Sequence, residues 1–491
     1  MRQVQDKQMK LGETDISDIV FDPKSRDDIP PLLMGLQHIY MNEKLRKEVF
    51  AILETIVPEE VDLDQGRPGM ELWKIFVMGT LRHNLNWDYD RLLEMVNNHK
   101  IIRQMLGHGL VDDEYRYNLQ TLKDNVRLFT PEALGKINRL VVEAGHFLVK
   151  ENEDEKLRGR CDSFVVETDV HYPTDINLLF DATRKVIQLI ALLCAMFGLT
   201  EWRQSASQIR RLKKLFRDAQ KIKHSSSKDE EKKEQQKARI VAAHEAYIEK
   251  ARDLVDKAKL TLVYIASAYD LFPWQVDEIM GFIAHAERQI DQIKRRVVHG
   301  EKIPHSEKVF SVFQEHTEWI KKGKAGVPVE LGLRVCILED QYGFILHHQV
   351  IQKQTDDKVA VSMVDETQAQ FSDLRVCSFD KGFWSPANRT ELEKRLDLLV
   401  LPKKGKLSLK DQAAQQSDEF IRSRRQHSAV ESGINALEVH GLDRCLDHGI
   451  DGFRRYVAMA VVARNIQKLG AILHAQLREK TKRKPAAHEA A

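Results

Sequence analysis

Three acidic residues occupy positions from which a carboxylate can do chemistry. Asp380 directly follows the apolar run LRVCSF, Asp162 opens the β-branched run DSFVVET, and Glu431 lies within the helical pattern RRQHSAVESGINALE. Binding sites in open α/β sheets form at the carboxyl ends of strands. If the three side chains converge, their oxygens suit two Mg²⁺ or Mn²⁺ ions. Two such ions about 4 Å apart activate a water or a 3′-hydroxyl for attack on a phosphodiester.

Sequence spacing leaves two points open. Asp169 follows Asp162 in the same predicted strand and competes with it for the first position. Convergence also depends on the fold, because positions 162, 380 and 431 are 218 and 51 residues apart. Taken singly, each acid is more typical of a solvated strand end or helix surface than of an active site. Whether the three acids form a site therefore depends on how the strands and helices that carry them are arranged.

Other catalytic patterns are weak or absent. His347 and His348 are adjacent on a predicted strand and point to opposite faces, which disfavours joint metal binding. His440, Cys445 and His448 lie close in sequence but lack the second cysteine pair of a zinc site. The sequence contains no GxxxxGK[ST], GxSxG or HExxH pattern. A P-loop ATPase and hydrolases with those signatures are thereby excluded.

Composition limits the class of protein. The chain has 491 residues, 42% of them hydrophobic, which is enough for cores in about three domains. The 76 Lys and Arg nearly balance 74 Asp and Glu, so a polyanion would be bound by local basic patches. Five scattered cysteines indicate a reducing compartment. The N-terminus lacks the pattern of a signal peptide, and the apolar run 189–199 is too short to span a membrane. We expect a soluble cytoplasmic protein.

The N-terminal part is predicted to be helical. Residues 1–28 are polar and aperiodic, which predicts a loose lead-in, and 29–150 show helical spacing of apolar residues. Three short helices between 70 and 106, with tight turns, are compatible with a helix-turn-helix DNA-binding domain. A small helical bundle without that function gives the same pattern, and both interpretations stay open.

Strands and a long helical stretch follow. Residues 161–170 predict a strand after a break at Gly159, and Thr174 is placed to cap the next helix. From 202 to 298 the pattern is charged and helical, with a serine-rich tip at 225–227, which predicts a protruding helical hairpin. Its block 210–223 carries seven basic residues against one Asp. This block is either a phosphate-binding surface or a solvated helix face.

Strand patterns return after the hairpin. Residues 329–338 and 343–352 flank EDQYG as a β-hairpin, and short strands are predicted at 374–379 and 398–401. Helices are predicted at 358–370, 388–395, 412–439 and 456–477, before a basic tail. This order predicts an α/β core of ribonuclease-H-like character, interrupted by a long helical insertion after its first strand and preceded by an all-α domain. The expected boundaries are 29–150 for the helical domain, 151–200 plus 300–475 for the core, 201–299 for the insertion and 476–491 for the tail.

Several motifs resemble one family. Asp162–Leu179 carries VVET and YPTD leading into LL, and residues 380–383 read DKGF. VESGINALE followed by HGLDRC occupies 430–445, and stretches 66–77 and 307–332 show further similarity. In this order the motifs resemble bacterial insertion-sequence transposases of the DDE type, over about residues 30–475. The family pattern also has a Tyr, an Arg and a Lys around the Glu, at positions that are Arg424, His427 and Glu438 here.

The resemblance implies a function and a set of site residues. Asp162, Asp380 and Glu431 would be the catalytic carboxylates that bind two Mg²⁺ or Mn²⁺ ions. The protein would bind terminal inverted repeats of its own insertion sequence, cleave the ends and join them to target DNA, acting as a homodimer on DNA. Phosphate contacts are expected from two basic groups, which are Arg210, Arg211, Lys213 and Lys214 in one and Arg424 and Arg425 in the other. The alternatives are a domesticated or inactive transposase derivative that only binds DNA, and a structural coiled-coil protein, which would leave the acid-bearing strands unexplained.

Overall fold

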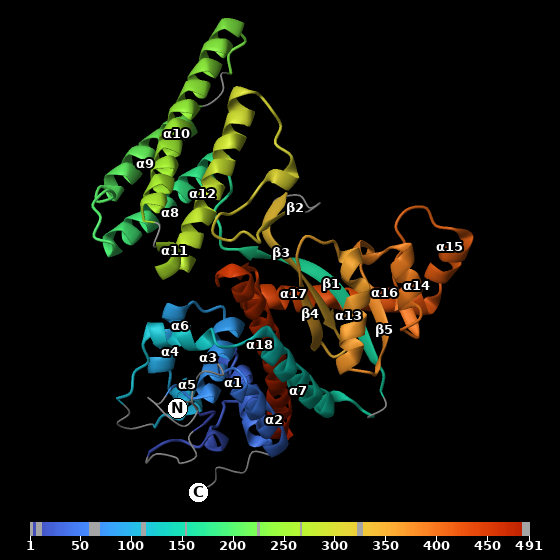
Figure 1. The fold of residues 1–491 in the computed structure, drawn as a ribbon. Helices are drawn as coiled ribbons and strands as arrows, with labels where there is room; N and C mark the ends of the chain where they lie inside the picture. The colour runs from blue at the N-terminus through green and yellow to red at the C-terminus, as the bar shows by residue number, and fades with distance from the viewer. Residues whose placement is uncertain are drawn as a thin grey trace. The chain divides into compact units, whose positions relative to one another are not determined.

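The computed structural model describes residues 3–5, 12–57, 69–109, 114–152, 155–222, 226–265, 268–321 and 328–483. The chain divides into two compact units, whose helices and strands are drawn in Figure 1. Unit 1 comprises Met1–Asp169 and Ile320–Ala491, and unit 2 comprises Val170–Trp319. Among the described residues, every helix is too short or too polar to cross a membrane.

A mixed β-sheet forms the framework of unit 1. Its strands are β1 (Leu157–Thr168), β2 (Glu318–Lys321), β3 (Val329–Glu339), β4 (Ile345–Ile351), β5 (Leu374–Phe379), β6 (Leu398–Val400) and β7 (Arg444–Cys445). The main order is β2-β3-β1-β5-β6, with β4 on β3 and β7 on β1. β1 is antiparallel to β3 and parallel to β5, and β6 is parallel to β5. The expected 329–338 and 343–352 hairpin is therefore present, as β3 and β4.

β1 is buried on both faces. Leu157 and Cys161 pack into one hydrophobic cluster and Phe164 and Val166 into another, as the alternation of side chains along a strand requires. The strand begins before the predicted position 161, so the expected break at Gly159 is wrong. A Cβ at Gly159 would lie 2.8 Å from a methyl of Leu338. The glycine permits close packing inside the strand and does not end it.

The helices of unit 1 pack on this sheet and on one another. They are α1 (Ile29–Met41), α2 (Glu43–Glu54), α3 (Leu72–Asn84), α4 (Tyr89–Asn98), α5 (Lys100–Met105), α6 (Leu119–Val126), α7 (Pro131–Val149), α13 (Asp356–Gln370), α14 (Pro386–Leu392), α15 (Leu409–Gln415), α16 (Asp418–His427), α17 (Ala429–Leu437) and α18 (Gly449–Arg483). Thr130 caps α7 by accepting a hydrogen bond from the N–H of Ala133. Thr130 is therefore the N-cap residue of α7.

The N-terminal helices do not form a separate domain, which corrects the expected boundary at 150. α18 contacts α1, α3 and α7 and also β4, so helices and sheet share one continuous core. The crossing of α1 and α18 is especially close, because a Cβ at Gly470 would overlap the carbonyl oxygen of Pro31. α18 is 35 residues long, and apolar residues on both of its sides pack into two hydrophobic clusters. The N-terminal helices and the sheet are therefore joined in one unit.

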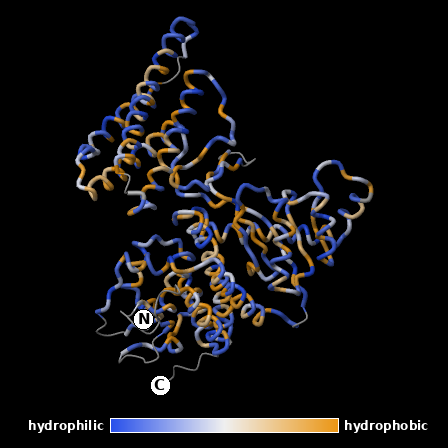
Figure 2. The backbone as a smooth tube through the Cα atoms, in the orientation of Figure 1, coloured by the Kyte–Doolittle hydropathy of each residue, from blue (hydrophilic) through white to orange (hydrophobic). Residues whose placement is uncertain are grey.

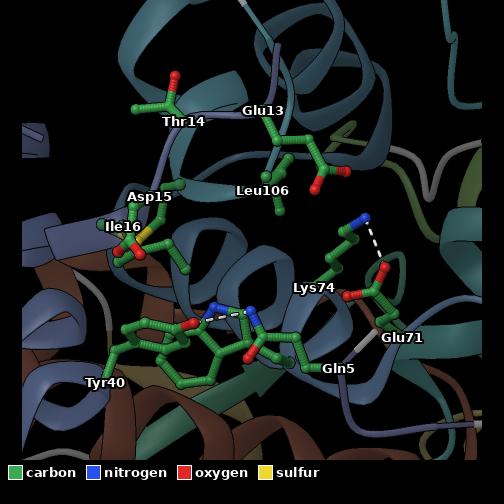
Figure 3. Close-up of a pocket in the computed structure, with 12 residues that line it drawn as sticks. Gln5, Glu13, Thr14, Asp15, Ile16, Tyr40, Glu71, Lys74 and Leu106 are labelled. Carbon is green, nitrogen blue, oxygen red and sulfur yellow. Dashed lines mark hydrogen bonds and ion pairs between the residues drawn. The ribbon is translucent and has the colours of Figure 1, made fainter. Parts of the chain in front are cut away.

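The N-terminal segment is packed where it is described, contrary to the loose lead-in expected for 1–28. Ile16, Ile19 and Phe21 are buried in the core of unit 1. The side-chain amide of Gln37 on α1 donates to the carbonyls of Ile16 and Ile19. Figure 3 shows a small pocket here, in which Gln5 donates to the Tyr40 hydroxyl over 2.8 Å. Apolar residues spaced too irregularly for a helix still anchor this segment.

Unit 2 is a helical bundle with its own core. It contains α8 (Asp175–Met196), α9 (Ser205–Lys221), α10 (Glu230–Tyr264), α11 (Ala268–Leu271) and α12 (Pro273–Ile293), together with the short helical segments η2 (Lys294–Val298) and η3 (His305–Glu307). Thr174 caps α8, as predicted. Residues 202–298 are helical where they are described, and α9 and α10, which precede and follow the predicted serine-rich tip, pack on each other. The insertion boundaries 201 and 299 differ from those of unit 2. α8 packs on α9, α10 and α12, so it belongs to the bundle and not to the sheet-bearing core.

The predicted single helix over 412–439 is also wrong. The structure divides it into α15, α16 and α17, followed by one π-helical turn (Glu438–Leu442). The Ser417 hydroxyl accepts a hydrogen bond from the N–H of Phe420 and thereby starts α16. Ser428 separates α16 from α17. Serine competes for backbone hydrogen bonds in this way, and apolar periodicity does not reveal it. The last helix is longer than predicted and includes residues 476–483 of the expected tail.

Candidate active site

Parallel pairing of β1 with β5 brings two of the three predicted acids together. Cys161 and Phe379 are directly paired Cα partners on these strands. Asp162 and Asp380 each follow one of them, and Asp380 retains an extended backbone. Side chains at matching positions of paired strands point to the same face of a sheet. The two carboxylates are therefore neighbours where β5 ends, at the middle of β1.

α17 carries the third acid over the same part of the sheet. α17 packs on β1, and Val430 lies in the hydrophobic cluster that contains Phe164 and Val166. Its approach is close at Gly433, where a Cβ would overlap the carboxylate of Glu339. The next position after Val430 is Glu431, which is exposed. Burial of one side of α17 thus presents Glu431 to solvent beside β1.

The electrostatics of Asp162 show that the acids share one region. Burial is the largest cause that raises its pKa, to about 6 from an ordinary 3.8. The N–H of Ser163, which donates to the carboxylate over 2.7 Å, opposes this shift. The charges of Asp380, Asp356 and Glu431 raise the pKa further. Like charges act in this way only at short range, so the predicted acids lie within electrostatic reach of one another.

Asp356 is a site residue that sequence reasoning missed. It opens α13, and the Ser163 hydroxyl donates to one of its carboxylate oxygens over 2.9 Å. The other oxygen lies 3.1 Å from where a Cβ on Gly382 would stand. Asp356 therefore lies between β1 and the turn that follows Asp380. The signal in the sequence was an Asp pair opening a helix, which is common because carboxylates favour helix N-termini.

Asp169 lies outside this group. It is exposed and pairs with Arg444 over 3.6 Å, and Arg444 also contacts Glu167. It is not among the main charges that shift the pKa of Asp162. Along an extended strand, positions 162 and 169 also point to opposite faces. The structure thus places Asp162, and not Asp169, beside Asp380.

His427 is an imidazole close to the carboxylates. Its Nδ1 lies 2.9 Å from the Ser378 hydroxyl of β5. Burial lowers the pKa of His427, and the negative charges of Asp380 and Glu431 oppose this. α16 ends at His427 and α17 starts at Ala429, so His427 and Glu431 lie on different helices. The two side chains are neighbours through packing on the sheet.

A buried ion pair supports the strands beneath the site. Arg160, two residues before Asp162, pairs with Glu339 over 3.4 Å and donates to the carbonyl of Asp340 over 3.0 Å. Burial raises the pKa of Glu339 to about 7, and Arg160 opposes the shift. The Asp340 carboxylate accepts from His146 over 2.6 Å. These contacts connect β1, the β3–β4 hairpin and α7.

The oxygen atoms of the carboxylates around Asp162 are chemically suited to bind hard divalent cations. The carboxylates of Asp380, Asp356 and Glu431 lie within electrostatic reach of Asp162, and Mg²⁺ and Mn²⁺ prefer oxygen ligands. Within the described ranges, however, no three His, Cys, Asp or Glu side chains are arranged to hold a metal ion. Asp380 and Glu431 are exposed to solvent. A bound cation would offset the negative charges of Asp380, Asp356 and Glu431, which add to the effect of burial in raising the pKa of Asp162.

The predicted basic residues lie on two helices. Arg424 and Arg425 are exposed in the last turn of α16, and Arg424 contributes to the lowered pKa of His427. Four exposed cations of α9, here called the α9 cations, are Arg210, Arg211, Lys213 and Lys214. Between them Leu212 is buried in the core of unit 2. The α9 cations therefore form a solvent-exposed basic face on a packed helix.

Comparison with known proteins gave no match, whether to a family model, to a curated protein or to a solved structure.

Proposed function

We propose that this protein is a DDE-type transposase with a ribonuclease-H-like catalytic core. The observation that carries the proposal is the in-register pairing of β1 and β5, which makes Asp162 and Asp380 neighbours. Glu431 reaches the same region on α17. The sheet supports the fold part of the proposal, since three antiparallel strands (β4, β3 and β1) adjoin two strands parallel to β1.

The residues have distinct roles in this proposal. Asp162, Asp380 and Glu431 would hold two Mg²⁺ or Mn²⁺ ions, which when bound activate the attacking water or 3′-hydroxyl and stabilise the leaving oxygen. Asp356 holds Ser163 and so orients the strand segment that carries Asp162. Arg424 and Arg425 contact DNA phosphates beside the carboxylates, and the α9 cations contact phosphates from unit 2. The helices of residues 29–110 bind the terminal inverted repeats.

Cleavage of end-containing DNA tests this function. The substrate is a labelled duplex with the inverted repeats that flank the gene, incubated with Mg²⁺ or with EDTA. Cleavage should be abolished in each of the variants Asp162→Asn, Asp380→Asn and Glu431→Gln. Each substitution removes the negative charge of a ligand carboxylate and keeps the shape of the side chain. Binding of the same duplex, measured by fluorescence anisotropy, should remain within about threefold of the wild type, since end recognition lies elsewhere.

Asp169→Asn is the matched control, because it makes the same change outside the carboxylate group. It should retain cleavage. Cleavage that persists in Asp380→Asn, or that is lost in Asp169→Asn but not in Asp162→Asn, contradicts the proposal. Tight binding of the repeats by the wild type without any metal-dependent cleavage would favour the derivative that only binds DNA.

A further inference from the structure

A cavity of about 600 Å³ lies within unit 1 and is separate from the candidate active site. It is bordered by the end of α3, the start of α4, by α6 and by the start of α18. Contacts join α3 to each of the other three helices, and Figure 1 shows α3, α4 and α6 side by side. Among the described residues that line the cavity there is none of the four site acids 162, 356, 380 and 431. Cavities of about 300–1,000 Å³ hold small organic ligands.

The floor of the cavity carries buried hydrogen-bond donors. The Arg82 side chain is only 2% exposed, and its guanidinium lies 4.1 Å from the centre of the Tyr89 ring. In the part of the chain that the structure describes, the Nε–H groups of Arg82 and Arg455 and the Tyr89 hydroxyl have no hydrogen-bond partner. Buried polar groups are normally paired, so these groups indicate a ligand that brings acceptor atoms.

Two helix N-termini add positive potential at the same place. Asp88 caps α4, Asp90 lies in the first turn of α4, and the first turn of α18 contributes Asp451 and Gly452 to the lining. A Cβ on Gly452 would lie 3.5 Å from an Nη atom of Arg455, so this turn adjoins the guanidinium. The first N–H groups of a helix have no partner within the helix and carry partial positive charge. Such ends, combined with arginine, are typical of phosphate sites.

The carboxylates of the lining do not cancel the positive floor. Asp447 places one oxygen 3.2 Å from Arg82 and the other 3.0 Å from Arg455, so one carboxylate serves two guanidiniums. Lys123 adds a cation, with its ammonium 5.8 Å from the centre of the Tyr89 ring. Figure 2 shows hydrophilic and hydrophobic stretches alternating along α4 and α6, as in helices that pack on a core with one side only. The remaining acids, at positions 88, 90 and 451, are exposed, so water screens their charges.

We propose that this cavity binds the terminal phosphate of a nucleotide. A phosphate monoester carries about two negative charges and three free oxygens, which match the donors of the floor. It is attached to the rest of its molecule on one side only and can therefore enter a recess, whereas a phosphodiester within a strand continues on both sides. The exposed Asp90 and Asp451 can accept hydrogen bonds from the hydroxyl or amino groups of the nucleoside. A free nucleotide and the 5′ end of a DNA strand both supply this group.

Isothermal titration calorimetry of the full chain with dAMP tests the inference. Divalent metal and repeat DNA are left out, because the site does not depend on the proposed cleavage activity. dAMP should bind with a Kd below about 1 mM, and deoxyadenosine, which lacks the phosphate, should bind at least about 10-fold more weakly. Arg455→Gln should weaken dAMP binding by about 10-fold or more. Arg127→Gln, at the exposed rim of the cavity, should weaken it by about threefold.

Arg454→Gln is the matched control, since it makes the same change at the next arginine of α18, which is exposed, lies outside the cavity lining and donates to Gln352. It should leave the Kd of dAMP unchanged. Circular dichroism reports whether Arg455→Gln folds, and Arg127→Gln alters a residue that is already in solvent. The inference is overturned if dAMP does not bind at about 5 mM, if deoxyadenosine binds equally well, or if the control weakens binding as much as the two cavity variants.

Competition experiments identify the source of the phosphate. A short DNA strand of unrelated sequence is prepared with a 5′-phosphate and with a 5′-hydroxyl, and each form is added to the dAMP complex. Displacement by the phosphorylated strand alone supports the inference with a DNA 5′ end as ligand, and displacement by neither supports it with a free nucleotide. Equal displacement by both forms contradicts it, since the phosphodiester backbone would then be sufficient for binding.

Discussion

Because the pKa of Asp162 is raised, the effect of its carboxylate on stability can be measured. Its folded pKa is about 6 and its ordinary value is 3.8, so the folded protein binds the proton more tightly than the unfolded chain. Stability therefore falls as pH rises from about 4 to about 6. The difference of about two units corresponds to about 3 kcal/mol, which is the cost of keeping Asp162 ionised at pH 8. Asp162→Asn cannot ionise and keeps an oxygen to accept from Ser163.

The variant should therefore be more stable than the wild type at pH 8, by up to about 3 kcal/mol, and equal to it at pH 4. Hydrogen exchange of β1 amides in EDTA measures the opening free energy of this strand directly, independently of unit 2. Addition of Mg²⁺ at pH 8 should stabilise the wild type, because ligand binding favours the folded state. The stability difference between Asp162→Asn and the wild type should then become smaller.

Asp169→Asn provides the comparison, since this exposed residue lies outside the carboxylate group. It should change the opening free energy of β1 by less than about 0.5 kcal/mol at either pH. If Asp162→Asn destabilises β1 at pH 8, or if its effect is the same at pH 4 and pH 8, burial and the neighbouring charges do not raise the pKa of Asp162 and the reasoning is refuted.

Three further outcomes rest on other parts of the structure. Replacing all four α9 cations by Ala should lower the slope of log K for DNA against log salt by about 0.9 for each phosphate that α9 no longer neutralises, and an unchanged slope removes α9 from the interface. Gly470→Ala should lower the free energy of unfolding by about 1–3 kcal/mol in urea titrations, because its Cβ overlaps the rigid carbonyl of Pro31. His146→Ala should cost about 1–3 kcal/mol in the same assay, since the fully buried Asp340 carboxylate is deprived of a partner, and a neutral effect would contradict that hydrogen bond.

Local features of the sequence determined much of the element pattern. Thr130 and Thr174 each precede a helix that they cap, because a side-chain oxygen satisfies a free N–H at the helix start. The runs at 329–338 and 374–379 were recognisable as strands because their apolar residues need burial on a sheet. Asp380 stood out since it directly follows such a run. All of these signals act between residues close together in the chain.

Only the tertiary structure decided which distant residues meet. The pairing of Cys161 with Phe379 makes Asp162 and Asp380 neighbours, and no local periodicity encodes the register between strands so far apart. Asp356 belongs with them because α13 begins beside Ser163, which its own sequence does not reveal. The placement of α8 in unit 2 and of α18 between helices and sheet was equally hidden. An apolar helix face indicates that the helix will be buried, but it does not indicate which element will cover it. The packing of the whole chain determines that partner.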